Sequence, residues 1–172
     1  MSKINIFLIL TGYQLTWLSC IFGEIYFNSY LGLITGSLYL FFFFYFVKDR
    51  HRAFKIILLF SLIGYVFDSL IVYFNIYSIK SDIIFLSLPV WFIVLWPSFI
   101  TLFVSVLNFL RDKKILSIFL GITFAPFTYY LGIPLGIAHS NNIFIMLISM
   151  VIFWGGFLYF YSYYLDNYDT NL

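Results

Sequence analysis

Six long apolar stretches, joined by short polar connections, dominate the sequence and leave few folds open to it. None of them alternates polar and apolar residues as the strands of a membrane barrel would. Each is near or above the roughly 20 residues that an α-helix needs to cross about 30 Å of hydrocarbon. The stretches cover residues 4–22, 30–47, 54–77, 83–110, 115–138 and 143–165. The pattern predicts an all-α integral membrane protein, a compact bundle of six transmembrane helices that forms a single domain, 1–172.

The composition agrees with a hydrocarbon environment and excludes several kinds of site. Charged residues make up 9% of the chain and hydrophobic residues 63%, whereas a soluble domain carries about 25% charged residues. The net charge of +2 is too small to indicate nucleic acid as a partner. Cys20, His51 and His139 lie far apart, so no metal-ligand spacing is present. We expect no metal and no cofactor.

The basic residues predict how the bundle is oriented. With six spans, eight of the nine Lys and Arg residues fall on one side of the membrane, and Lys80 falls on the other. The positive-inside rule then places both termini in the cytoplasm. The eight residues are Lys3, Lys48, Arg50, Arg52, Lys55, Arg111, Lys113 and Lys114.

One acidic side chain, Asp68 in GYVFDSL, lies inside a predicted helix. An ionisable group costs at least a few kcal/mol in the bilayer, so it needs a structural or functional reason. At 100° per residue it shares a narrow face with Ser61, Gly64 and Asn75, and this polar face is expected to point into the bundle. Its expected partner is Gln14 of the first helix or a tyrosine. Two other polar residues, Glu24 and His139, are expected to be solvated at helix ends.

The fourth stretch contains LPVWFIVLWPSF, with two prolines and two tryptophans. Pro89 and Pro97 are expected to kink or loosen the outer half of this helix at the depth of the buried acid. Trp91 shares a face with Ser98 and is expected to line a pocket. Trp96 lies on another face and is expected to meet lipid or another helix.

The fifth stretch carries small residues at spacings of three and four, which allow close approach between helices. They are Gly121, Ala125, Thr128, Gly132 and Gly136. Two prolines in the same stretch, Pro126 and Pro134, remove backbone donors and free carbonyl groups near Tyr129. Together the helices predict an outward-facing pocket around Asp68. Its expected ligand-binding residues are Gln14, Trp17, Asp68, Trp91, Ser98 and Tyr129, and its expected structural residues are Gly64, Pro89, Pro97, Pro126, Gly132 and Gly136.

The motifs YQLTWLSCIFGE, GYVFDSL, PVWFIVLWPSFITLFVSVLNFL and LGITFAPFTYYLGIPLGIA, in this order, resemble one bacterial family. It is the group of small inner-membrane proteins catalogued as domain of unknown function 2878. The resemblance covers nearly the whole chain and implies a multi-pass protein of the bacterial inner (cytoplasmic) membrane. It implies no activity, substrate or cofactor. The residues that match its motifs are Gln14, Trp17, Gly23, Gly64, Asp68, Pro89, Trp91, Trp96, Pro126, Tyr129 and Gly136; Ala125 stands where the family pattern has glycine.

Three functions stay open. The first is permease-like binding or transport of a small amphipathic or lipid-like molecule in the pocket around Asp68. The second is an intramembrane enzyme that modifies a lipid or isoprenoid, with Asp68 as the candidate catalytic acid or base. The third is an accessory subunit of a larger membrane complex. The expected partners are membrane lipid and either a second copy of the chain or a larger complex. No HExxH, Gly-rich phosphate loop or GxSxG motif is present.

Overall fold

The computed structural model describes residues 3–107 and 113–168 of the chain. In this part six helices follow one another, one for each apolar stretch, and they confirm the all-α class. Their bounds are α1 Lys3–Tyr26, α2 Tyr30–Phe46, α3 Arg50–Tyr73, α4 Phe92–Ser105, α5 Lys114–Leu131 and α6 Ile143–Tyr168. Four of them, α1, α3, α5 and α6, are long and apolar enough to cross a membrane. The two others are apolar but shorter, with 17 residues in α2 and 14 in α4.

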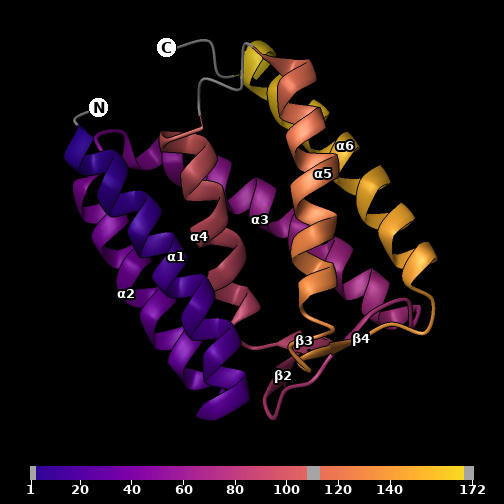
Figure 1. Ribbon diagram of the computed structural model, residues 1–172. Helices are drawn as coiled ribbons and strands as arrows, with labels where there is room; N and C mark the ends of the chain where they lie inside the picture. The colour runs from indigo at the N-terminus through magenta and orange to yellow at the C-terminus, as the bar shows by residue number, and fades with distance from the viewer. Residues whose placement is uncertain (1–2, 108–112, 169–172) are drawn as a thin grey trace.

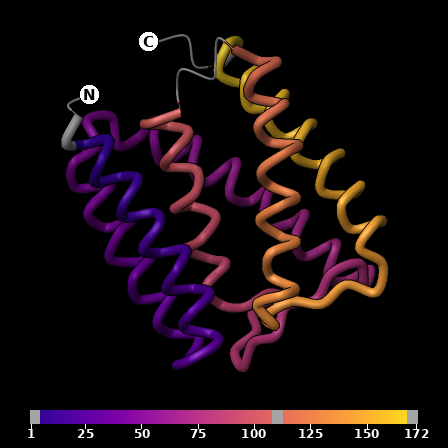
Figure 2. Tube along the Cα trace, viewed as in Figure 1, coloured from indigo at the N-terminus to yellow at the C-terminus, as the bar shows by residue number. Residues whose placement is uncertain are grey.

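The helices form two groups that meet along α3. Helices α1 and α2 pack on each other and on α4, α4 packs on α3, and α5 packs on α6 as an antiparallel hairpin. Figure 1 shows α4 between the α1–α2 pair and the α5–α6 pair, with α3 crossing behind them. The trace in Figure 2 follows the same alternating course up and down the molecule. This arrangement leaves α4 and α5 facing each other across the middle of the molecule.

Small residues bring α1, α2 and α4 close together. A Cβ atom added to Gly32 of α2 would lie 2.7 Å from the Cα atom of Cys20 in α1. One added to Gly36 would lie 2.8 Å from the Cβ atom of Val94 in α4. In a bilayer, helices gain little from leaving lipid, so close packing of this kind supplies much of their association.

Aromatic rings join the α5–α6 hairpin to α3. Phe67 of α3 stacks on Phe153 of α6, with ring centroids 3.7 Å apart and planes inclined by 3°. Nearer the start of α3, Phe60 is fully buried and meets Phe157 and Tyr161 of α6 edge to face. Such pairs add to stability beyond the area they bury. The contact fixes one edge of the hairpin and leaves its α5 side free to border a cavity.

Two small sheets lie at the end of the bundle where α3 and α5 finish. Strand β1, Ser78–Ile79, pairs antiparallel with β4, Ala138–His139. Strand β2, Ile84–Phe85, pairs antiparallel with β3, Leu88–Pro89, in a hairpin. These segments shorten three of the predicted helices: the third ends at 73 instead of 77, the fourth begins at 92 instead of 83, and the fifth ends at 131 instead of 138.

The prediction that Pro89 kinks a helix is therefore wrong, because Pro89 lies in β3 before α4 begins. The turn before it has positive φ at Leu86 (46°) and Ser87 (72°), a conformation that no α-helix contains. Pro134 likewise follows α5 in a series of turns. Pro97 and Pro126 do lie inside α4 and α5 as predicted.

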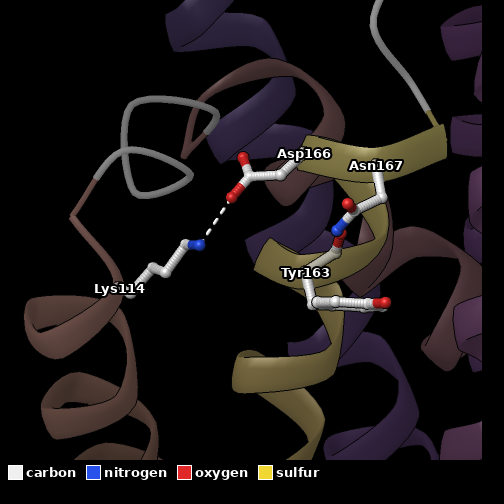
Figure 3. A network of polar contacts seen from close by, with 4 residues as sticks. All are labelled: Lys114, Tyr163, Asp166 and Asn167. Carbon is white, nitrogen blue, oxygen red and sulfur yellow. Dashed lines mark hydrogen bonds and ion pairs between the residues drawn. The ribbon is translucent and has the colours of Figure 1, made fainter.

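The starts of α1, α3 and α5 lie at one end of the bundle, together with the end of α6 (Figure 1). There Lys114 Nζ of α5 lies 2.6 Å from Asp166 Oδ2 of α6, and Asn167 donates a hydrogen bond to the Tyr163 carbonyl (Figure 3). Lys80 lies in the segment between β1 and β2, at the opposite end. Arg111 and residues 108–110 of the fourth stretch lie outside the described residues.

Candidate functional site

A cavity of about 440 Å³ lies between α4 and the α5–α6 hairpin, and its lining is mostly apolar and aromatic. It borders α5 from Ser117 to Gly132, about 22 Å at the rise of an α-helix. The cavity is therefore elongated along α5.

Asp68 lies in the wall of this cavity and connects three helices. Its side chain is buried, with 1% exposure, on α3. Trp96 Nε1 of α4 donates to Asp68 Oδ2 at 2.7 Å, and the Tyr129 hydroxyl of α5 donates to Oδ1 at 2.8 Å. Both carboxyl oxygens thus have a donor from another helix. The polar face of α3 does point inward, since Ser61 and Gly64 are also buried.

The partner of Asp68 is a tyrosine and not Gln14. The side chain of Gln14 is exposed on α1 and does not line the cavity, so the expected pairing is absent. Asn75 is not part of the polar face of α3, because the helix ends before it at Tyr73.

Trp96 lies in the middle of the cavity wall, whereas the sequence predicted that it meets either lipid or another helix. It is 4% exposed and stacks on Trp154 of α6, with ring centroids 5.6 Å apart and planes inclined by 16°. A Cβ atom added to Gly64 would overlap the Trp96 ring. Gly64 therefore provides the space that lets this indole reach Asp68, one turn further along α3.

Tyr77 closes the end of the cavity near the strands. Its hydroxyl donates a hydrogen bond to the Tyr129 carbonyl at 2.9 Å, and the backbone nitrogen of Gly132 donates to the same carbonyl at 3.1 Å. Burial, with a further contribution from Asp68, raises the pKa of Tyr77 well above its usual range. The phenol therefore keeps its proton and stays a hydrogen-bond donor. A Cβ atom at Gly132 would lie 2.7 Å from this hydroxyl, so the position requires a very small residue.

A second polar cluster, centred on Glu24, holds the loop before α4 against the end of α1. Trp91 Nε1 donates to Glu24 Oε2 at 2.7 Å, and Ser81 Oγ donates to the same atom at 3.0 Å. Ser29 Oγ donates to Oε1 at 2.8 Å, and the backbone nitrogen of Asp82 does so at 3.3 Å. Glu24, which was expected to be solvated, is half-buried and hydrogen-bonded, because residues 81–91 fold back against it. This contact also fixes Trp91 in the cavity wall.

The structure brings together four of the six predicted ligand-binding residues. Trp17, Asp68, Trp91 and Tyr129 line the cavity, whereas Gln14 and Ser98 do not. Ser98 is fully buried inside the helical bundle. Among the structural residues, Gly136 occupies a turn with φ of +76° after α5, and Gly121 of the small-residue stripe meets Leu158 of α6. Part of that stripe therefore packs within the chain.

Sequence reasoning missed Trp154, which lies in the middle of α6 and lines the cavity. Tryptophans of membrane proteins gather at the two interfaces. Trp154 lies about 17 Å from the start of α6, far from either expected belt. Its position in the middle of a predicted helix is the sequence feature that could have identified Trp154. No group of three or more His, Cys, Asp or Glu residues suited to a metal ion occurs within 3–107 and 113–168.

Comparison with known proteins gives one match. The model of a family described as "Protein of unknown function (DUF2878)" matches residues 6–160. The match confirms the resemblance carried by the helix motifs. No curated protein and no solved structure matches the chain.

Proposed function

Since the chain belongs to the family described as protein of unknown function DUF2878, we propose its function from its cavity: it binds one chain of a lipid-like, amphipathic molecule between α4 and α5. We place it in the bacterial inner membrane as a multi-pass protein, with uptake or transport of that molecule as its role. The cavity carries this proposal. Its volume of about 440 Å³ falls within the roughly 300–1,000 Å³ of small-molecule sites.

The position of the lining residues supports entry from the side of the bundle. Phe124 of α5 lines the cavity and is 62% exposed, and Thr128, one turn further along, is also an exposed lining residue. In a bilayer this side of α5 faces hydrocarbon. An acyl or isoprenoid chain can then enter from the membrane without crossing water.

The bonding of Asp68 favours binding over acid–base chemistry. Its two oxygens already accept hydrogen bonds from Trp96 and Tyr129, so the carboxyl group holds two walls of the cavity in place. A catalytic acid or base needs an oxygen within hydrogen-bond reach of its substrate. Asp68 is thus a positioning residue for the cavity.

All six helices cross the membrane in this proposal, with both termini in the cytoplasm. The short helix α4 spans about 21 Å. Residues 83–91 complete its outer part as a loop, in which Leu88 and Pro89 are buried and the β2–β3 ladder satisfies backbone groups. Residues 84–87 are exposed, so we place this part of the loop at the membrane interface, because uncovered irregular backbone is not tolerated in hydrocarbon.

A quenching experiment tests the proposed binding. All four tryptophans, Trp17, Trp91, Trp96 and Trp154, line the cavity, so their fluorescence responds to a quencher that occupies it. A monoacylglycerol with a brominated chain, added to the protein in a nonionic detergent, should quench their fluorescence in a saturable way once the chain occupies the cavity. Bromine quenches only on near contact, so quenching reports entry.

A matched pair of variants controls this experiment. Thr128 and Thr123 are both exposed on α5, and each donates to the carbonyl four residues before it, at 2.9 Å and 2.8 Å. Only Thr128 lines the cavity. Thr128→Phe should abolish saturable quenching, and Thr123→Phe should leave it unchanged. Equal quenching in both variants, or none in the natural protein, would reject the proposal.

A further inference from the structure

A second, polar pocket of about 270 Å³ lies at the end of the bundle that carries the strands. Three charged side chains line it: Glu24 near the end of α1, and Lys80 and Asp82 between β1 and β2. The other lining residues are Ile25, Ser81, Leu135, Gly136 and Ile137. Its lining thus differs in kind from that of the apolar cavity.

The polar pocket borders the apolar cavity. Ile137 lines both of them, and its carbonyl accepts a hydrogen bond from the backbone nitrogen of Lys80 at 2.8 Å. Ile79, the residue before Lys80, lines the cavity. Trp91 lines the cavity too, and its Nε1 donates to Glu24 in the polar pocket. An amphipathic molecule whose chain lies along α5 therefore has a polar site beside one end of that chain.

The charges of the polar pocket are not paired with one another. Within residues 3–107 and 113–168, Glu24, Lys80 and Asp82 form no ion pair. Both Glu24 oxygens already accept hydrogen bonds from the uncharged donors described above, so Glu24 contributes mainly its negative charge. The side chains of Lys80 and Asp82 are exposed and make no hydrogen bond to the described residues. Two carboxylates and one ammonium group thus face a common space.

We propose that the polar pocket binds a zwitterionic headgroup of the phosphoethanolamine type, on the lipid whose chain occupies the apolar cavity. This inference rests on the proposed function and names the headgroup. The ammonium group of the lipid lies against Asp82 and the charge of Glu24, and its phosphate lies against Lys80. An anionic phosphoglycerol headgroup has no cation for the two carboxylates, and a neutral glycerol headgroup leaves all three charges without a partner.

The lining also distinguishes a primary ammonium from a quaternary one. Quaternary ammonium groups are bound by aromatic cages, and no aromatic residue is among the described residues that line the polar pocket. A primary ammonium carries three hydrogen-bond donors, which suit carboxylate oxygens such as those of Asp82. Ethanolamine therefore fits better than choline.

The test compares two lysophospholipids that carry the same brominated acyl chain and differ only in the headgroup, phosphoethanolamine or phosphoglycerol. Each is titrated against tryptophan fluorescence in a nonionic detergent. The natural protein should bind the ethanolamine lipid about fivefold more tightly, the size expected of one exposed charge pair. The net charge of +2 would by itself favour the anionic lipid, so this preference reports the polar pocket.

Three variants assign the preference to residues. Asp82→Asn should weaken binding of the ethanolamine lipid several-fold and spare the phosphoglycerol lipid. Lys80→Gln should weaken both lipids alike, because both carry the phosphate. Lys55→Gln is the matched control, since Lys55 is also exposed but lies on α3 near the opposite end of the bundle, and it should change neither affinity.

The other outcomes overturn the headgroup assignment. Equal affinities of the natural protein for the two lysophospholipids do so, as does a preference that Asp82→Asn leaves intact or a loss that Lys55→Gln shares with Lys80→Gln. If the brominated monoacylglycerol quenches saturably in these cases, the proposed function stands without this headgroup. If neither it nor either lysophospholipid quenches saturably, both proposals fail.

Discussion

Asp68 is a hydrogen-bond acceptor for two helices, and its substitutions should follow that role. Asp68→Leu leaves the Trp96 N–H and the Tyr129 hydroxyl buried without an acceptor. Each unpaired group costs about 1–3 kcal/mol, so the free energy of unfolding should fall by about 3 kcal/mol or more. Asp68→Asn keeps one acceptor oxygen, and the Tyr129 hydroxyl can rotate to accept from the amide, so the loss should be about 1 kcal/mol.

Unfolding in mixed micelles of SDS and a nonionic detergent measures both values. Quenching by the brominated monoacylglycerol then separates the functional hypotheses, since a binding role predicts that Asp68→Asn still binds the lipid. Equal destabilisation by Asn and Leu would contradict the acceptor role. Loss of binding in a fully stable Asp68→Asn protein would return the acid–base hypothesis to consideration.

Gly64 is the second residue whose identity the cavity wall requires. Gly64→Ala places a methyl group in the ring of Trp96, which is buried and cannot move aside. Overpacking of this kind costs about 1–3 kcal/mol of unfolding free energy. Trp96→Phe in the same chain should relieve part of that cost, which a double-mutant cycle measures.

Gly156→Ala is the matched control. Gly156 also lies inside a helix, α6, but no atom lies within 4 Å of its added Cβ position. Its substitution should be neutral or stabilising by up to about 1 kcal/mol, because alanine favours helix. Additive effects of Gly64→Ala and Trp96→Phe would contradict direct contact between the two residues.

At the residue scale, the sequence indicates which faces are polar but not which faces meet. The inward position of Asp68 follows from its shared face with Ser61 and Gly64 and from the cost of charge in lipid. Gln14 has a suitable depth, yet α1 packs on α2 and α4, and its Gln14 side faces outward. Helical periodicity fixes angles around one axis, whereas contacts depend on how separate helices are arranged.

At the element scale, the β2–β3 hairpin holds backbone strain. Leu86 and Ser87 form its two-residue turn, both with positive φ, where non-glycine residues are disfavoured. Leu86→Asn combined with Ser87→Gly supplies the residues that such turns prefer. Leu86 is 69% exposed, so little packing is lost. The pair should raise the free energy of unfolding by about 1 kcal/mol.

The same unfolding titration measures this gain, with Leu86→Val as the control. A β-branched residue tolerates positive φ least, so this variant should be destabilised. No difference between the Asn-Gly and Val variants would show that the turn carries no strain.

Hydropathy predicts the six helices but misplaces three of their ends for an understandable reason. Ile84, Phe85 and Leu86 are as apolar as the helix that follows them. In membrane proteins a loop can be apolar because it is covered by protein or meets lipid, so composition no longer distinguishes loop from helix. The turn itself contains Leu-Ser in place of the glycine or asparagine by which hairpins are recognised.

At the scale of the whole molecule, the cavity arises because two groups of helices touch along one line. Phe67 and Phe153 bring α6 against α3, and the Asp68 cluster ties α5 to α3 and α4. The space that remains between α4 and α5 is the cavity. No single stretch of sequence encodes this space, which depends on distances between helices far apart in the chain.

The placement of the basic residues yields a prediction for the molecule as a whole. Lys48 and Lys80 are both exposed, at opposite ends of the bundle, and buried Cys20 offers little background for thiol labelling. A membrane-impermeant maleimide should label Lys80→Cys in intact spheroplasts, because the positive-inside rule puts that end outside. Lys48→Cys should react only after the membrane is permeabilised. Labelling of Lys48→Cys and not of Lys80→Cys in intact spheroplasts would show the opposite orientation. Labelling of both would contradict the six-span topology, because Lys48 and Lys80 lie on opposite sides of the membrane only if α3 crosses it.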